Sequence, residues 1–293
     1  SRLSTAILWI GAAIMFFPVV WMVLSAFKTP QELLEYPPSL LPDTWSTEFI
    51  AYIWSERNFG RMMLNSVFVS TVVTLLTVFS SAYIAYVFRT FDFRFRMPLF
   101  YLIIATTMVP LPVLVLPHFQ IVLWLGWLNT YQALIMPYAL WGFGIFLMYQ
   151  FLAGFPHDLI DAARLDGVTE RQIFQYVVLP LMKSPCVALG IITFLGQWES
   201  LLWPLVAANA PEMQMLPAGL ATFSGNAVES ADLFNPYSAA LIAALPLLVA
   251  FVIFQRMIVT LGATQRQTQK SLADVFRHVF RILMNRKKVG RTI

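Results

Sequence analysis

The chain has 293 residues, of which 59% are hydrophobic and only 12% are charged, and its mean hydropathy is +0.71. Ordinary soluble domains carry roughly 25% charged residues, so this composition excludes such a domain and indicates an all-α integral membrane protein. The net charge of +4 does not indicate a nucleic-acid partner, because the basic residues are distributed by membrane side, and the single Cys186 excludes an intrachain disulfide.

Long uncharged stretches set the number of expected membrane spans, since a spanning helix needs about 20 apolar residues. Residues 97–157 contain no charge and are long enough for two spans with a turn near 126–130. The first stretch is too long for a signal-peptide core, so we expect a retained helix. We expect six transmembrane helices, at about 5–27, 63–88, 98–122, 132–154, 184–206 and 236–258.

The distribution of basic residues predicts the orientation of these spans. With the N-terminus in the cytoplasm, only Lys28, Arg57 and Arg61 of the 19 Lys and Arg residues lie outside. Both termini are therefore expected in the cytoplasm. We expect residues 1–265 to form the membrane domain and residues 266–293 to form a basic cytoplasmic tail, either an amphipathic helix on a surface or a disordered segment.

A polar segment separates the fourth and fifth predicted spans and carries the signals of a short helix. Pro156 suits a first helical turn, and Asp158 and Asp161 place negative charge near the helix N-terminus. Ala162 and Ala163 are small, so they leave a smooth face that a partner can approach closely. The positive-inside pattern predicts that this helix lies in the cytoplasm.

A second short helix is predicted to follow after a sharp bend. Gly167 is a natural stop for the first helix, residues 169–172 have the pattern of a capping box, and Pro180 is expected to end the second helix. The pair has two interpretations, a docking element for a partner or a plain solvated connection between membrane helices.

The same residues resemble the EAA loop of importer-type ABC transporter permeases. Residues 161–163, then Gly167, then residues 177–180 match the spacing Glu-Ala-Ala, three residues, Gly, nine residues, Ile-x-Leu-Pro. Asp161 replaces the Glu and Val177 replaces the Ile. The resemblance implies contact with a separate ATPase through the following residues: Asp158, Asp161, Ala162, Ala163, Asp166, Gly167, Leu179 and Pro180.

Other fragments resemble the sugar-importing, maltose-type branch of these permeases: Asn65-Ser66, 108–130, 201–205 and 216–220. The resemblance covers roughly residues 5–265. It implies a non-catalytic subunit of an ATP-driven sugar or oligosaccharide importer in the bacterial inner membrane. The implied partners are a second homologous permease, two ATPase subunits that hold ATP and Mg²⁺, an extracytoplasmic binding protein and membrane lipid; no cofactor is expected in this chain.

Polar residues within the predicted spans are candidates for the translocation path. Asn65, Gln197 and Glu199 are assigned to it, because an intramembrane polar group faces a cavity or a polar partner; a structural hydrogen bond is the alternative. In maltose-type relatives the outer loop corresponding to 207–235 reaches into the binding protein. The resemblance therefore implies a contact there, or a plain connector, for Thr222, Ser224, Gly225 and Asn226.

Motifs for other chemistry are missing from the sequence. No lysine follows a glycine, which excludes the phosphate loop of ATP-binding proteins. His118, His157 and His278 are scattered, so neither a metal site nor a catalytic constellation is expected. The alternative function, an ion-coupled secondary carrier, would need several titratable residues in the spans, and Glu199 is the only charge placed there.

Overall fold

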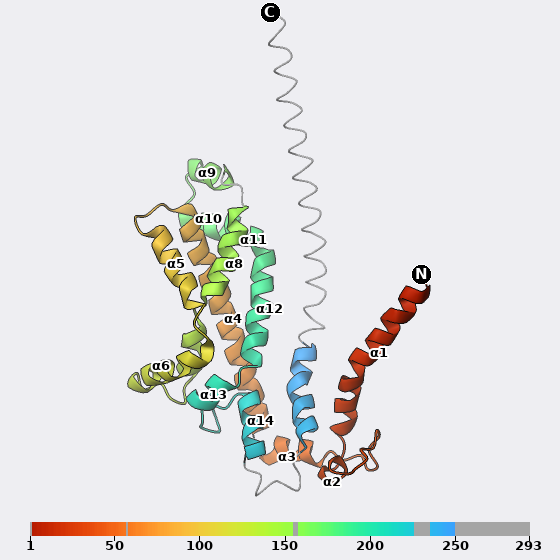
Figure 1. The fold of residues 1–293 in the computed structure, drawn as a ribbon. Coiled ribbons are helices and arrows are strands. Elements are labelled where there is room, and N and C mark those ends of the chain that lie inside the picture. Colours follow the sequence, from red (N-terminus) through yellow and green to blue (C-terminus); the bar gives the residue numbers. More distant parts are fainter. Residues whose placement is uncertain (1, 57, 155–157, 226–234, 250–293) are drawn as a thin grey trace, which may run out of the picture. The chain divides into compact units, whose positions relative to one another are not determined.

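The computed structural model describes residues 2–56, 58–154, 158–225 and 235–249, and these residues form helices, turns and loops without any strand (Figure 1). The chain divides into two compact units, residues 1–247 and 248–293, and the elements labelled in Figure 1 belong to the first. The predicted tail 266–293 and residues 250–258 of the predicted span 236–258 lie outside the described residues.

Two described helices are long and apolar enough to cross a membrane without interruption, α1 (Arg2–Ser25) and α4 (Phe59–Thr90). They include nearly all of the predicted spans 5–27 and 63–88. The short helices α2 (Pro30–Leu33) and α3 (Glu48–Glu56) lie between them in the sequence.

The span predicted over 98–122 is two helices in the structure, α5 (Arg96–Thr106) and α6 (Leu111–Trp124), bent by 101°. The break falls at Pro110, which has no backbone N–H to continue the helical ladder and has a fixed φ. The sequence analysis expected a single span here and did not predict so large a change of direction.

The predicted turn after this segment is confirmed. Gly126 and Asn129 adopt positive φ angles of 68° and 58°, and both residue types tolerate this left-handed conformation. The chain then forms α7 (Tyr131–Ile135), the 3₁₀-helix η1 (Met136–Tyr138) and α8 (Gly142–Ala153), with a bend of 41° before α8.

The span predicted over 184–206 is also interrupted. It consists of α12 (Lys183–Trp198) and α13 (Leu202–Ala207), with a break over residues 199–201. Pro204 explains the break, because a proline clashes with the carbonyl four residues earlier, at Ser200, if the helix continues through it. Beyond lie α14 (Leu216–Gly225) and an apolar helix, Pro236–Val249.

Helix α4 is the centre of the first unit, and it packs most extensively against α8 and α12 (Figure 1). Small side chains permit this approach: Ala82 and Ala85 of α4 are fully buried, and a Cβ on Gly144 of α8 would lie 2.6 Å from Ser81 Oγ. The three helices therefore form one closely packed frame, and the segment that follows α8 is built onto one end of it.

Candidate functional site

Helix α9 (Asp158–Leu165) has an inner and an outer face. Ile160 is buried in the apolar cluster formed with α4 and α8, and Ala163 packs partly against the same cluster. Asp161, Ala162 and Leu165 are exposed. The prediction treated both alanines as one smooth surface, but in the structure Ala162 faces outward while Ala163 contributes to the attachment of the helix.

Leu165 is an outward-facing residue that the sequence analysis did not single out. Its side chain is 89% exposed, although it stands in an otherwise charged helix. The helical period places it there once Ile160 is known to be buried, because a residue five positions after Ile160 falls off the inner face. With Ala162 it forms a small apolar surface beside the Asp161 carboxylate.

The end of α9 is a Schellman turn at Gly167, which has a φ of +75°. The Val168 N–H donates to the Ala163 carbonyl at 3.2 Å, and the Gly167 N–H donates to the Arg164 carbonyl at 3.0 Å. These two bonds satisfy carbonyls that a helix end otherwise leaves free. The predicted stop at Gly167 is confirmed.

The second helix begins where the capping box was predicted. The N–H and the hydroxyl of Thr169 both donate to Gln172 Oε1, at 3.1 and 2.7 Å, and α10 (Glu170–Ile173) follows. The predicted end at Pro180 is confirmed to within one residue, because the helix continues through a π-turn segment, Phe174–Val178, and ends with α11 (Leu179–Leu181).

Pro180 has no N–H, yet the helix includes it. The wider π turn before it changes the pairing between backbone N–H groups and carbonyls, so the missing N–H breaks no regular helical hydrogen-bond ladder. The change of direction comes instead at Met182, the C-cap of α11, where the chain bends by 76° into α12. We call α9, α10, Phe174–Val178 and α11 together the elbow, and α12 is its direct continuation.

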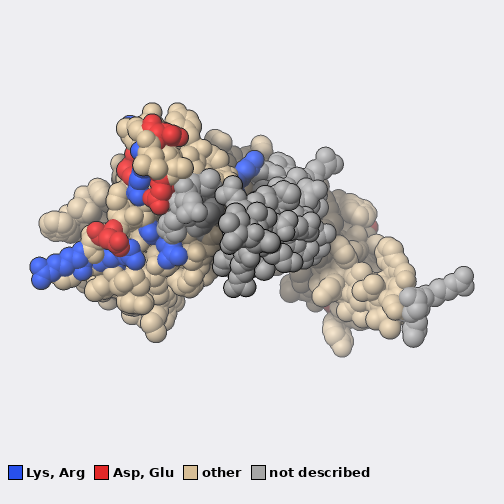
Figure 2. All heavy atoms as spheres, turned by 90° about the horizontal axis from the view of Figure 1, so that it is seen from above, with Lys and Arg blue, Asp and Glu red and all other residues tan. Residues whose placement is uncertain are grey.

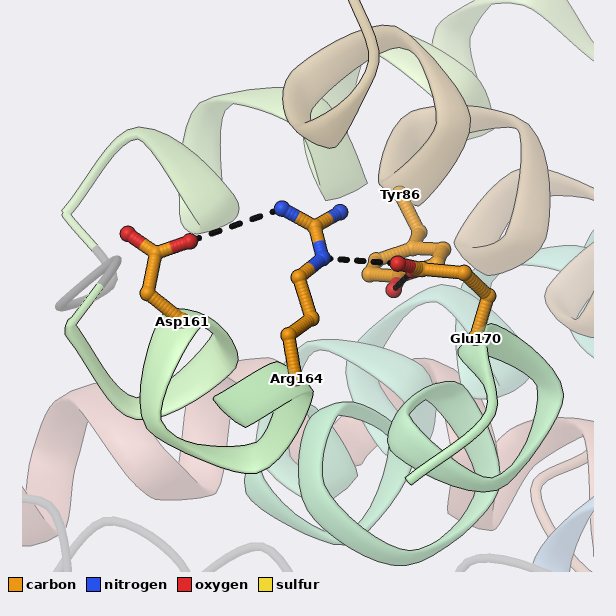
Figure 3. Close-up of polar contacts among 4 residues, drawn as sticks. All are labelled: Tyr86, Asp161, Arg164 and Glu170. Atoms are coloured by element: carbon orange, nitrogen blue, oxygen red, sulfur yellow. Dashed lines mark hydrogen bonds and ion pairs between the residues drawn. The ribbon is translucent and has the colours of Figure 1, made fainter. Parts of the chain in front are cut away.

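One carboxylate joins the elbow to the helical frame. Glu170 accepts a hydrogen bond from Arg164 Nε at 2.6 Å and another from the Tyr86 hydroxyl at 2.5 Å, and Arg164 also contacts Asp161 at 3.4 Å (Figure 3). Arg164 lies on α9, Glu170 on α10 and Tyr86 on α4. The network therefore connects the neighbouring helices α9 and α10 to α4, which is distant in sequence.

The Arg164 guanidinium holds the pKa of Glu170 below its usual range, and the same contact raises the pKa of Arg164. Both groups are consequently charged at neutral pH. Their side chains are 40% and 35% exposed, so the ion pair alone stabilises the elbow only modestly. The Tyr86 side chain, in contrast, is 1% exposed, and its hydroxyl depends on Glu170 for a partner.

Aromatic packing supports the same attachment. The Phe174 ring lies 5.2 Å from Tyr83, 5.4 Å from Tyr86 and 6.0 Å from Phe79, between ring centroids. All three partners belong to α4. Such pairs contribute about 0.5–1.5 kcal/mol each beyond burial, so the elbow and this end of α4 form one rigid body.

The elbow lies at a strongly polar end of the first unit. Seen from the α9 end, acidic and basic side chains gather over α9 and its neighbours, whereas the rest of the described surface in that view is mostly uncharged (Figure 2). A charged surface of this kind is stable in water and is costly in lipid. The elbow is therefore a water-facing end of the first unit (Figure 2).

Asn65, one of the predicted path residues, is 1% exposed and fully hydrogen-bonded. Its amide donates to the carbonyls of Glu212 at 2.8 Å and Gln214 at 3.0 Å, and its oxygen accepts from the Tyr131 hydroxyl at 2.7 Å. Asn65 thus holds α4 against the segment before α14. A role for it in the translocation path stays a prediction.

Gln197 and Glu199 are not brought together. Gln197 lines a cavity of about 580 Å³ between α4, α6, α8 and α12. Glu199 is exposed at the break after α12, rather than inside a helix as predicted. Thr222 lies in α14, where its hydroxyl donates to the Gly219 carbonyl at 2.7 Å; Ser224 and Gly225 end that helix, and Asn226 lies outside the described residues.

Apolar helices broken within their length, together with a water-facing helical elbow at one end, define a membrane translocation subunit. The chain belongs to the family described as binding-protein-dependent transport system inner membrane component, whose model matches residues 81–261. It is therefore a permease subunit of a bacterial ABC importer, located in the inner membrane, as the resemblance at the elbow implied.

Two curated relatives show the extent of the similarity. The chain is 32% identical over 260 residues to the diacetylchitobiose uptake system permease protein NgcG of Streptomyces coelicolor, covering 88% of this chain and 86% of that protein. It is 34% identical over 248 residues to the arabinooligosaccharides transport system permease protein AraQ of Halalkalibacterium halodurans, covering 84% and 88%.

A solved structure shares the fold. It is that of a bacterial ABC transporter involved in the import of the acidic polysaccharide alginate, with a TM-score of 0.73 and 18% sequence identity. The match covers 87% of this chain and 95% of that one. At this identity the likeness concerns the arrangement of helices.

Proposed function

We propose that this chain forms one half of the pathway of an ATP-driven saccharide importer, and that hydrolysis takes place in separate ATPase subunits. The names of its relatives support a saccharide cargo, since NgcG and AraQ are named for diacetylchitobiose and arabinooligosaccharides. The chain has no phosphate loop of its own. ATP and Mg²⁺ accordingly belong to the partner subunits.

The proposed assembly contains a second homologous permease, two ATPase subunits and an extracytoplasmic binding protein. In this chain residues 1–265 supply six spans, with both termini in the cytoplasm and a basic tail at 266–293. Two uninterrupted helices, the bent pairs α5–α6 and α7–α8, helix α12 and the shorter helix Pro236–Val249 are compatible with that number. Thr222, Ser224, Gly225 and Asn226 are assigned to contact with the binding protein.

The elbow is assigned to coupling, with Asp161, Ala162 and Leu165 presented to a cleft of the ATPase. Asp158, Asp166, Gly167, Leu179 and Pro180 belong to the same docking element. The observation that carries this proposal is the Glu170 carboxylate, because its bonds to Arg164 and Tyr86 join the outer helix to α4. A push on α9 is then transmitted to α4 through Glu170 and to α12 through the bend at Met182.

An arginine at the outward-facing alanine tests this assignment. Ala162→Arg adds a long charged side chain to the docking surface without entering the core, so we expect normal membrane insertion but weak association with the ATPase subunits. The loss of saccharide-stimulated ATP hydrolysis is expected to be at least about tenfold, since a buried unpaired charge costs several kcal/mol. The measurement is ATPase activity and co-purification of the complex in nanodiscs.

The control is Ala51→Arg, the same change at an exposed alanine of α3, and it is expected to leave assembly and hydrolysis unchanged. Ala163→Arg is less informative, because Ala163 packs against the core and the variant can fail by misfolding. An Ala162→Arg complex that assembles fully and keeps saccharide-stimulated hydrolysis would show that the ATPase binds elsewhere.

A further inference from the structure

The cavity beside Gln197 lies where two membrane helices are interrupted. The α5–α6 break supplies Thr107 and Pro110 to its wall, and the break before α8 supplies Tyr138 and Trp141. Irregular backbone at membrane depth is tolerated only where it is buried in protein or lines a cavity. Both helix interruptions line this cavity, which is the setting in which irregular backbone is tolerated.

This wall is closely packed. A Cβ on Gly142, the first residue of α8, would lie 2.7 Å from the Ile103 carbonyl oxygen and 2.8 Å from Thr107 Cγ2. Only glycine permits this contact between the start of α8 and the end of α5, since no real side chain approaches so near. The two breaks are thereby held against each other, and they frame an opening of about 580 Å³. That size lies within the range of small-molecule sites, about 300–1,000 Å³.

Helix α12 presents two polar side chains to the opening, Thr193 and Gln197, one turn apart on the same face. Thr193 is only 7% exposed, and its hydroxyl has no hydrogen-bond partner among the described residues. A buried polar group without a partner costs free energy, so this hydroxyl indicates that a ligand or ordered water completes the site.

The rest of the wall consists of aromatic and apolar side chains, His118, and three threonines whose hydroxyls donate to backbone carbonyls, Thr77, Thr106 and Thr107. Trp141 and Tyr138 supply rings, and none of the described lining residues is Asp, Glu, Lys or Arg. An anionic ligand placed here would lose its hydration without meeting an opposite charge, which is strongly unfavourable. Hydroxyl groups and ring faces of a neutral sugar, in contrast, match one hydroxyl, one amide and an aromatic ring.

We infer that this cavity is a binding site within the subunit for an uncharged saccharide unit, with Thr193 and Gln197 as hydrogen-bonding residues and Trp141 as the packing surface. The inference rests on the proposed function and deepens it, because it assigns the cargo class to neutral sugars. It also distinguishes this subunit from the permease of an acidic-polysaccharide importer, because an acidic cargo would require basic side chains in its binding site.

Ligand protection of a single cysteine tests the site directly, because delivery by the binding protein conceals the affinity of the permease in uptake assays. Thr106 is exposed and lines the cavity, and Cys186 is the only native cysteine. Thr106→Cys in a Cys186→Ser background is alkylated with N-ethylmaleimide in the purified complex with its partner permease and ATPase subunits. The probes are diacetylchitobiose, an arabinooligosaccharide and an alginate oligosaccharide.

We expect at least one neutral probe to slow alkylation about tenfold at a concentration of about ten times its Kd, and the acidic probe to have no effect. Adding Thr193→Val or Gln197→Leu is expected to raise the half-protecting concentration about fivefold, the usual effect of losing one hydrogen bond. Thr74→Val is the matched control, since its hydroxyl donates to its own helix, at the Ser70 carbonyl. Gln120→Cys, outside the cavity lining, is expected to show no protection.

Uptake by the wild-type complex with its binding protein separates the two proposals. If it transports none of the three saccharides, the proposed function and this inference both fail. If it transports one, and Thr106→Cys is not protected by the neutral probes or is protected by the acidic one, the importer stands and only the neutral-sugar site is overturned. Protection that survives both α12 substitutions unchanged also overturns it.

Discussion

The elbow and the cavity are both regions where helices end, but their backbone groups are satisfied in opposite ways. At the elbow the caps come from neighbours in sequence, as Thr169 and Gln172 show. At the break before α8, hydroxyls of α4 supply the bonds: Thr77 donates to the Tyr138 carbonyl at 2.9 Å and Ser80 to the Ala139 carbonyl at 3.0 Å. The free backbone groups of a helix end within a membrane cannot hydrogen-bond to water, so they need a partner from another helix.

The difference extends to the forces that hold each region. Charge-assisted hydrogen bonds attach the elbow to α4 through Glu170 (Figure 3), whereas a close contact at Gly142 holds the cavity wall. Substitutions are therefore expected to damage one region and to leave the other intact. The predictions below use this separation, beginning with the largest expected effect.

Replacing Glu170 by alanine is expected to have the largest effect, because it removes the partner of both Arg164 and the buried Tyr86 hydroxyl. We expect a destabilisation of about 2–3 kcal/mol. This is less than the sum for two fully buried charge-assisted hydrogen bonds, because Glu170 is partly exposed. The measurements are the thermal midpoint of the purified complex and the number of ATP molecules hydrolysed per saccharide. Cysteine protection in the cavity is expected to persist.

A double variant sharpens the assignment. In Glu170→Ala with Tyr86→Phe, no buried hydroxyl is left unpaired, so the combined destabilisation is expected to fall short of the sum of the two single variants by about 1 kcal/mol. Strict additivity would mean that the bond between Tyr86 and Glu170 contributes nothing to the attachment of the elbow.

Gly142→Ala is expected to damage the cavity wall instead. The added methyl group would meet the Ile103 carbonyl at 2.7 Å, so α5 and α8 must separate, at a cost of about 2 kcal/mol. Cysteine protection by a neutral saccharide is expected to weaken, while co-purification with the ATPase stays normal. The control is Gly190→Ala, where the nearest atom lies at an ordinary 3.6 Å. Equal effects of the two substitutions would contradict the close contact.

Gly167→Ala tests the turn of the elbow. The added side chain meets no other atom, but the φ of +75° is unfavourable for any residue with a Cβ. We expect a loss of about 1 kcal/mol, seen as faster hydrogen exchange of the Val168 amide. Gly167→Asn is expected to be milder, since asparagine tolerates the left-handed region. If alanine and asparagine behave like the wild type, the backbone conformation at Gly167 is not the determinant.

Acid is expected to have the smallest effect. The pKa of Glu170 is lowered in the folded protein, so its contribution is fully present above the unfolded pKa of about 4.3. That contribution is lost as the pH falls through the lower folded value. The opening free energy of the elbow, obtained from hydrogen exchange corrected for the intrinsic pH dependence of amide exchange, should be constant from neutral pH down to about 4.3. It should fall below that pH by less than about 1 kcal/mol, and this dependence should be lost in Glu170→Gln.

Much of the elbow was predictable, and particular residues show why. Gly167 and the capping box at 169–172 act on backbone groups a few positions away, so sequence spacing alone identifies them. Pro180 marked the end of the second helix to within one residue, but the π turn before it was not predicted. The outward position of Leu165 and the inward one of Ala163 required knowledge of which side of α9 meets the core.

In the membrane region, too, short-range features were predictable from the sequence and long-range contacts were not. Composition by itself determined that the chain is helical and embedded in lipid, and long uncharged stretches indicated where its spans lie. Only the tertiary structure decided the 101° bend after α5, the partner of Glu170 at Tyr86, 84 positions away, and the joining of Trp141 with Thr193 in one cavity. The physical reason is range: caps, helical periods and hydropathy act between near neighbours in the chain, whereas a cavity or a buried hydrogen bond requires segments to meet across the fold.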